Sequence, residues 1–263
     1  MEAKYDTIGI DYNLTRKADP YLTEQFLHYL KPIKSGTYLD IGCGTGNYTN
    51  EFQKKGFRFI GVDPSLEMLE KAKLKNDQVD WKIGSAEEIG LPENFVDGII
   101  GSLTIHHWTH LENGISQLYK VLKPNGRFVI FTSTPKQMKG YWLQHYFPKM
   151  LADSILQMPS LERVEKAMAA TGIEDLEVSK YFIKPDLQDQ FLYCGKHNPE
   201  LYFDAHVRYG ISSFSSLAHR TEVEHGLSQL RSDIDSGNIN EIIESYKNDL
   251  GDYVFVFGRK PSS

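Results

Sequence analysis

The sequence predicts an α/β fold in which a doubly wound, mostly parallel sheet has a final antiparallel strand and carries a helical lid or insertion. Over about 100 residues, five apolar strand-like segments alternate with helical ones, which is the pattern of a parallel sheet with right-handed crossovers. The first strand runs directly into a glycine-rich turn, "GCGTG", and a helix follows. The chain then closes on "GDYVFVFGRK", a further strand-like segment.

The elements of the core follow from apolar spacing and from start and stop signals. "YLTEQFLHYL" has apolar residues at helical spacing and is stopped by Pro32. Pro64 ends the second strand, and Ser65 is placed to cap the helix after it. In chain order we expect helices at 21–30, 47–55, 65–75 and 111–123, and strands at 38–41, 57–63, 79–83, 96–103 and 127–132.

The regular alternation stops after Pro135. Residues 136–157 are rich in Met, Tyr and Trp and are expected to be helical; a helix with Gly172 near its end and a strand follow. Residues 186–250 show no clear strand pattern. The predicted organisation is a single domain over 1–263, with an N-terminal arm at 1–20, a core at 35–133, lid elements at about 136–157 and 186–250, and a final strand at 252–258.

Composition and charge limit the classes of function. The net charge is −6, the pI is about 5.9 and no run of five basic residues occurs, which argues against an extended nucleic-acid surface. The two cysteines, Cys43 and Cys194, are too few for a disulfide framework and lack zinc-site spacing. The N-terminus has no apolar signal core, and no stretch approaches 18 apolar residues. We therefore expect a cytoplasmic protein without a membrane segment, as a monomer or homodimer.

The glycine turn carries the strongest chemical signal. Glycine permits positive φ and lets the backbone approach a ligand closely, so three glycines in five residues need a reason. Gly42, Gly44 and Gly46 follow the spacing G-x-G-x-G, whereas sites that bind a dinucleotide pyrophosphate use G-x-G-x-x-G. Asp40 precedes the turn by two residues, which favours a ligand with an ammonium group or hydroxyls. A tight turn with nothing bound is the alternative.

A series of motifs in order resembles those of the class I S-adenosylmethionine-dependent methyltransferases, in particular the small-molecule enzymes of type 11. "LDIGCGTG" resembles the first motif, "GVDPSLEMLEKAK" the second, "GSAEEIGLPENFVDGIIGSLTIHHW" the third and fourth, and "LYKVLKPNGRFVIF" the fifth-strand signature. The resemblance covers about residues 35–133 and fades over 136–250. It implies a Rossmann-like fold, S-adenosyl-L-methionine as cofactor and S-adenosyl-L-homocysteine as product.

The resemblance also implies a cofactor site at the strand ends. The glycines would line the methionine part, and the Asp63 carboxylate would accept hydrogen bonds from both ribose hydroxyls; the alternative for Asp63 is a helix-start carboxylate. Ser85 stands where an aspartate is common, so either Ser85 or Glu87 would contact the adenine, together with the Ala86 backbone. The full expected cofactor set is Tyr12, Arg16, Asp40, Gly42, Gly44, Gly46, Asp63, Pro64, Ser85, Ala86, Glu87 and Ser102.

Three histidines, His106, His107 and His110, follow the fourth strand. Adjacent side chains on an extended backbone point to opposite faces, so His106 and His107 are not expected to share a metal ion, and we predict no metal site. Imidazole titrates near neutral pH, which suits His107 as a general base beside the sulfonium. Packing at the strand end is the alternative for His107.

The N-terminal arm holds Tyr5, Tyr12 and Arg16. The Y-x-x-x-R spacing from Tyr12 to Arg16 resembles the arm of small-molecule members of the family. This resemblance implies that Arg16 pairs with the cofactor carboxylate and that a tyrosine ring faces the sulfonium, a contact of ~0.5–2 kcal/mol. The alternative is that Arg16 is a surface charge beside the first helix.

The predicted reaction is in-line transfer of a methyl group to a small-molecule acceptor. The sulfonium is already a good leaving group, so the protein would mainly supply alignment in a pocket closed by a lid. Aromatic residues of the lid suggest an apolar or aromatic acceptor: Tyr141, Trp142, Tyr146, Phe147, Tyr202, Phe203, Tyr209 and Phe214. Other functions stay open: an NAD-dependent or nucleotide-sugar enzyme, a non-catalytic S-adenosylmethionine-binding protein, and a methyltransferase acting on RNA or protein.

Overall fold

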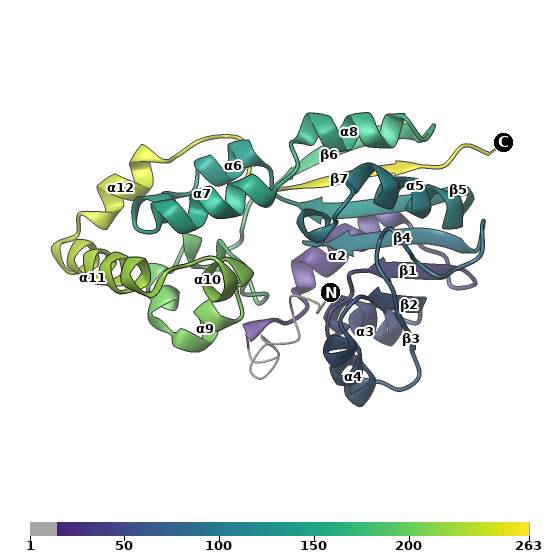
Figure 1. Ribbon diagram of the computed structural model, residues 1–263, viewed down its shortest axis with the longest axis horizontal. Helices are drawn as coiled ribbons and strands as arrows, with labels where there is room; N and C mark the ends of the chain where they lie inside the picture. The colour runs from purple at the N-terminus through teal and green to yellow at the C-terminus, as the bar shows by residue number, and fades with distance from the viewer. Residues whose placement is uncertain (1–14, 263) are drawn as a thin grey trace.

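A seven-stranded sheet forms the centre of the computed structural model, which describes residues 15–262 (Figure 1). The strand order is β3-β2-β1-β4-β5-β7-β6. The strands are β1 (Thr37–Ile41), β2 (Arg58–Asp63), β3 (Asp80–Ile83), β4 (Val96–Ser102), β5 (Leu122–Thr132), β6 (Glu174–Tyr181) and β7 (Tyr253–Arg259). Strands β1 to β5 pair in parallel, and β7 runs antiparallel to β5 and β6. The predicted fold class, including the final antiparallel strand, is confirmed.

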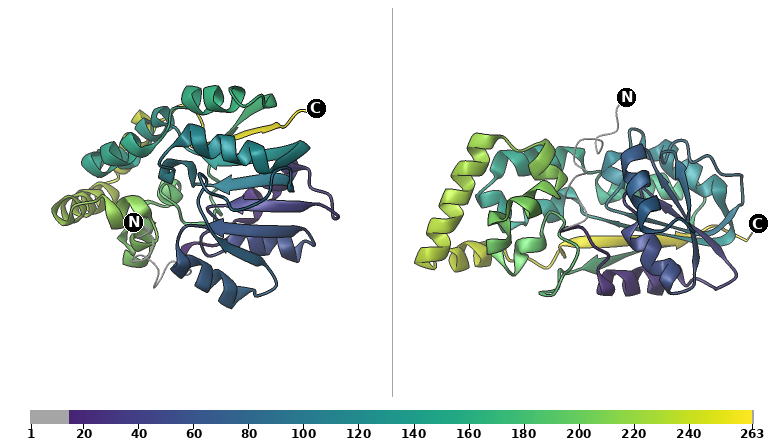
Figure 2. Two further views of the ribbon diagram at one scale, coloured as in Figure 1. Left: turned by 45° about the vertical axis from the view of Figure 1, so that its right-hand side comes forward. Right: turned by 90° about the horizontal axis from the view of Figure 1, so that it is seen from below.

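Helices cover both faces of the sheet (Figure 2). They are α2 (Pro20–Leu30), α3 (Asn47–Lys54), α4 (Leu66–Lys75), α5 (Leu111–Val121) and α8 (Leu161–Ala169). Side chains of a strand alternate between faces: in β5, Val129 and Phe131 share a core with α2 and α3, whereas Phe128 and Ile130 share one with α5 and α8. Because helices cover both faces, side chains on both sides of a strand are buried, and the strands appear as continuous apolar runs in the sequence.

Side-chain caps begin two of the helices that the sequence predicts. Ser65 caps α4 as predicted, because its side chain accepts a hydrogen bond from the Met68 amide at 3.3 Å. Asp19 does the same for α2 through the Leu22 amide at 2.8 Å. The fifth strand differs from the prediction: it begins at Leu122 rather than Arg127, because Leu122 already pairs with Val96 before a register shift.

The lid is a group of short helices beyond the carboxyl ends of the parallel strands (Figure 1). It contains α6 (Pro135–Lys139), η2 (Trp142–His145), α7 (Pro148–Gln157), η3 (Cys194–Lys196), η4 (Pro199–Phe203), α9 (Ala205–Tyr209), α10 (Ser212–Ser216), α11 (Arg220–Ser236) and α12 (Ile239–Ser245). Its apolar core is continuous with the α2 face of the sheet. Among the described residues no helix combines the length and apolarity that a membrane crossing requires.

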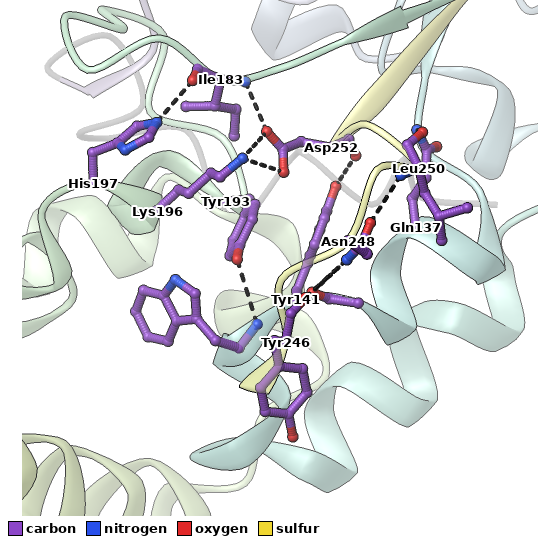
Figure 3. Close-up of polar contacts among 12 residues, drawn as sticks. Gln137, Tyr141, Ile183, Tyr193, Lys196, His197, Tyr246, Asn248, Leu250 and Asp252 are labelled. Atoms are coloured by element: carbon purple, nitrogen blue, oxygen red, sulfur yellow. Dashed lines mark hydrogen bonds and ion pairs between the residues drawn. The ribbon is translucent and has the colours of Figure 1, made fainter. Parts of the chain in front are cut away.

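Asp252 attaches the lid to the sheet (Figure 3). It is buried just before β7, and its carboxylate pairs with Lys196 of η3 at 2.6 Å and accepts a hydrogen bond from the Ile183 amide at 2.8 Å. Its carbonyl oxygen accepts hydrogen bonds from the hydroxyls of Tyr141 and Ser133. Asp252 therefore accepts hydrogen bonds from two parts of the lid, through Tyr141 and Lys196. It also accepts them from the residues Ser133 and Ile183, which follow β5 and β6.

Removing this carboxylate should loosen the lid. We expect Asp252→Ala to lower the free energy of unfolding by roughly 2–4 kcal/mol, because the Lys196 ammonium and the Ile183 amide would lose a buried partner. Urea unfolding followed by tryptophan fluorescence measures it. Glu200→Ala, which breaks the exposed pair with Arg231, is the control and should cost no more than about 1 kcal/mol. Equal losses in both variants would contradict the role given to Asp252.

Candidate functional site

Three glycines in the left-handed conformation shape the turn after β1. Gly42, Gly44 and Gly46 have φ values of 70°, 53° and 71°. A Cβ on Gly42 would lie closer than 3.0 Å to the Thr104 hydroxyl, and a Cβ on Gly46 as close to the Trp81 ring. At Gly44 the same position faces open space. The outer glycines therefore allow the turn to pack, and the middle one leaves room in front of the backbone.

Asp63, the last residue of β2, connects this turn to the neighbouring strand. Its Oδ2 accepts a hydrogen bond from the Gly44 amide at 2.8 Å, and its Oδ1 accepts one from the Ser65 amide at 2.9 Å. The two contacts hold the carboxylate at the point where the parallel strands β1 and β2 both end. A carboxylate has about four acceptor positions, so binding two amides does not exclude ligand hydroxyls.

Asp40 lies beneath the turn and does not line the cavity described below. It is 3% exposed, and its Oδ2 accepts a hydrogen bond from the Thr49 hydroxyl of α3 at 2.5 Å. Burial raises the pKa of Asp40 to about 7, and the negative charge of Asp63 adds to this, while the Thr49 hydrogen bond opposes it. The structure thus shows Asp40 joining β1 to α3, and its expected ligand contact stays a prediction.

A cavity separates the strand ends from the lid. Its core wall includes residues predicted for the cofactor, Gly42, Gly44, Asp63, Pro64 and Ser102, and the predicted base His107. Its opposite wall, called the lid wall below, includes Met138, Ser154, Phe191 and Ser213 from the lid, with Ser133 next to β5 and Tyr253 at the start of β7. The centre of a water-sized sphere can move through a volume of about 140 Å³ in this cavity. On the same measure, this is roughly ten times the volume that one bound water requires. The cavity can therefore admit a small molecule between the two walls.

The residues expected at the adenine do not line this cavity. The Ser85 hydroxyl accepts a hydrogen bond from the Glu88 amide at 3.2 Å, and a Glu87 carboxylate oxygen accepts one from the His110 amide at 3.0 Å. Ala86 is buried against Gly114 of α5. The structure thus gives these three residues local roles, and a contact with adenine stays a prediction.

His106 and His107 both line the cavity, with ring centroids 3.9 Å apart and an interplanar angle of 47°. The expectation that they point to opposite faces was wrong. They lie on a 3₁₀ turn, η1 (Ile105–His107), in which successive side chains are about 120° apart, instead of on extended backbone. Within residues 15–262 no group of three or more His, Cys, Asp or Glu is arranged to hold a metal ion.

Arg16 lines the cavity from the arm, and its guanidinium pairs with Asp189 of the segment before η3, with Nε–Oδ1 at 2.5 Å and Nη2–Oδ2 at 3.3 Å. Its side chain is 16% exposed, which excludes the surface-charge alternative. Asp189 also accepts a hydrogen bond from the Tyr48 hydroxyl at 3.2 Å. Tyr5 and Tyr12 lie outside the described residues, so their expected contacts stay predictions.

Sequence reasoning missed Asp189 and the serines of the lid wall. Asp189 is buried, although nothing in "DLQDQF" distinguishes it from the surface acids around it. The aromatic lid residues singled out instead, such as Trp142 and Tyr202, are buried in the lid core and do not line the cavity. Composition alone could not separate residues that pack the lid from residues that face the cavity.

Cys43 sits in the glycine turn, where a nucleophile would be well placed. Burial raises the pKa of its thiol well above the usual value, and the negative charges of Asp63 and Asp40 add to the rise. A thiol held protonated is a poor nucleophile, so Cys43 acts as a packed residue here.

Comparison with known proteins identifies the family. Residues 39–130 match the family model described as "Methyltransferase domain". An uncharacterised methyltransferase of Alkaliphilus oremlandii is 30% identical over 164 residues, which are 62% of this chain and 68% of that protein. A solved structure from Anabaena variabilis, described as a candidate methyltransferase from an antibiotic biosynthesis pathway, is 32% identical with a TM-score of 0.83, over 93% of this chain and 98% of that one. The chain belongs to the S-adenosylmethionine-dependent methyltransferases.

The family resemblance predicted from the motifs is therefore confirmed. A ubiquinone/menaquinone biosynthesis C-methyltransferase of Geotalea daltonii is 26% identical over 209 residues, covering 67% of this methyltransferase and 89% of that protein. The chain spans about half the length of the first curated relatives that it matches.

The raised pKa of Asp40 predicts a pH-dependent stability. A carboxyl whose folded pKa exceeds its unfolded value of 3.8 stabilises the fold fully below about pH 4, and this contribution is lost as the pH rises through about 7. Relative to Asp40→Asn, the wild type should lose roughly 2–4 kcal/mol between pH 4 and 7.5. Urea unfolding of both proteins at several pH values measures it; a difference that does not change with pH would contradict the prediction.

Proposed function

We propose that this methyltransferase transfers a methyl group from S-adenosylmethionine to a small-molecule acceptor bound in the cavity. The cavity carries the proposal, because its core wall contains the glycine turn and Asp63, while the described residues of its lid wall all have uncharged side chains. The relatives named for quinone and antibiotic biosynthesis support a small-molecule acceptor.

The residues of the core wall fit the proposed cofactor. The open space in front of Gly44 suits a ligand lying against bare backbone, and the Asp63 carboxylate suits a pair of ribose hydroxyls. We assign Gly42, Gly44 and Ser102 to the methionine part and Pro64 to the ribose side. Contacts of Ser85, Ala86 or Glu87 with adenine, and of Tyr12 and Arg16 with the methionine end, complete the proposal.

When bound, S-adenosylmethionine supplies an activated methyl group on a sulfonium. The chain then has to align the acceptor with that group and exclude water. The lid provides the exclusion, because its wall joins the arm through Arg16 and Asp189 and joins the sheet through Asp252. We assign to His107 the removal of a proton from the acceptor, since its ring lines the cavity from the end of β4.

The whole chain is proposed to act as one methyltransferase domain. The arm, the core and the lid elements would each supply part of one cavity, because Arg16, Asp63 and Ser213 all line it. This arrangement makes the arm and lid parts of the same site instead of separate modules.

The Gly44→Ala variant tests the cofactor site. Its Cβ would project into the space in front of the turn, so the affinity for S-adenosylhomocysteine should fall at least about tenfold, as measured by calorimetry. Gly237→Ala is the control: it has φ of 79° and open space, but ends α11 away from the cavity. Both variants should lose about 1–2 kcal/mol of stability from the left-handed backbone.

Two results would count against the proposal. Normal affinity in Gly44→Ala would refute the role of the turn, and a wild-type protein that binds neither S-adenosylmethionine nor S-adenosylhomocysteine would refute the function. Binding without transfer of labelled methyl to any acceptor would favour the non-catalytic alternative.

The His107→Gln variant tests the assigned base. With an acceptor found by labelled-methyl screening, kcat should fall by about 10²–10⁴ while S-adenosylhomocysteine still binds normally. His110→Gln is the control, because His110 does not line the cavity. A His107→Gln protein with wild-type kcat and lowered stability would show that the ring only packs.

A further inference from the structure

The lid wall of the cavity differs from the core wall in its charge. In the part of the chain that the structure describes, the lid residues that line the cavity include no Asp, Glu, Lys or Arg. Arg16 reaches the cavity from the arm, but its guanidinium is paired with Asp189. Transferring an ionised group from water into such surroundings without a partner is strongly unfavourable. The part of an acceptor that lies against the lid wall should therefore be uncharged.

Most of the lid wall is apolar and adaptable in shape. Phe191 and Tyr253 form an edge-to-face pair with centroids 4.9 Å apart, which gives the wall a rigid aromatic corner. Met138 and Met158 line the same space, and their unbranched side chains can follow an irregular ligand. These surroundings favour burial of a ring or a hydrocarbon part.

Several polar side chains interrupt this apolar wall, Ser133, Gln157 and Ser212 among them, and one buried hydroxyl pair joins two lid helices. The Ser154 hydroxyl of α7 donates to the Ser213 hydroxyl of α10 at 2.8 Å, and both side chains are more than nine-tenths buried and line the cavity. When one hydroxyl donates to another, the second O–H proton still needs an acceptor. Neither hydroxyl has a further partner among residues 15–262. By contrast, the Ser133 hydroxyl already bonds the Asp252 carbonyl.

We propose that the acceptor is an uncharged, largely apolar molecule whose oxygen atom accepts a hydrogen bond from the Ser154–Ser213 pair. This inference rests on the proposed function, since it concerns the acceptor side of the same cavity. A buried donor left without a partner is unfavourable, so the pair discriminates against molecules that lack the oxygen. Ser154 and Ser213 are thus specificity-determining residues supplied by two different helices of the lid.

Four probes of similar size test the inference: acetophenone, ethylbenzene, benzoate and benzylamine. Each is titrated by calorimetry or by NMR, with and without saturating S-adenosylhomocysteine. Wild-type protein should bind acetophenone about 3- to 10-fold more tightly than ethylbenzene, the usual value of one hydrogen bond. It should bind benzoate and benzylamine at least about 100-fold more weakly than acetophenone.

The double variant Ser154→Ala/Ser213→Ala separates recognition from packing. It should bind acetophenone and ethylbenzene equally, a readout that a loss of stability alone would not produce. Ser215→Ala is the matched control on the same helix, because its hydroxyl bonds the Ile211 carbonyl at 3.1 Å and does not line the cavity. This control should keep the wild-type preference.

Three outcomes would overturn the inference: a charged probe that binds as tightly as acetophenone, an unchanged preference in the double variant, or no binding of either neutral probe at millimolar concentration. Failure of the proposed function is distinguishable, because it appears as absent binding of S-adenosylhomocysteine. In that case the titrations made without S-adenosylhomocysteine still measure the preference among the probes.

Discussion

The site depends on the hydrogen bond between the Gly44 amide and the Asp63 carboxylate. The amide can reach the carboxylate because the turn runs through left-handed conformations that glycine adopts without strain. The same turn lets Thr104 approach Gly42, and the Thr104 hydroxyl in turn accepts a hydrogen bond from the Trp108 indole at 3.2 Å. The ends of β1, β2 and β4 are thereby fixed relative to one another, and with them the 3₁₀ turn that carries His107.

Two buried acids extend this arrangement to the arm and lid. The Asp189 carboxylate accepts hydrogen bonds from the Arg16 guanidinium and the Tyr48 hydroxyl. Asp19 caps α2, and its carboxylate also accepts a hydrogen bond from the Gln188 amide at 2.9 Å. A buried carboxylate is tolerated only when its charge is compensated, so each of these contacts constrains the others. Arg16, α3 and the segment before η3 are therefore held together beside the cavity.

The sequence predicted features whose causes are local. The glycine spacing, Asp63 at a strand end, the Ser65 cap and the alternation of strands with helices each follow from a few neighbouring residues. Contacts over long separations could not be predicted: Arg16 and Asp189 are 173 residues apart, and Ser154 and Ser213 are 59 apart. The histidine geometry was wrong for a different reason, because the strand pattern gave no sign that β4 ends in a 3₁₀ turn.

The two walls of the cavity have separate physical origins, so the side proposed for the cofactor and the side proposed for the acceptor are built independently. The core wall is built from backbone turns and Asp63, whose positions follow from the sheet. The lid wall is built mostly from side chains of the lid helices and their connections, with Ser133 and Tyr253 from the ends of β5 and β7. Asp252 couples the two, because it anchors the lid and is followed directly by Tyr253, which lines the cavity. Under the proposed function, a change of acceptor would therefore involve residues of the lid wall, whereas Asp252 and the glycine turn would be kept.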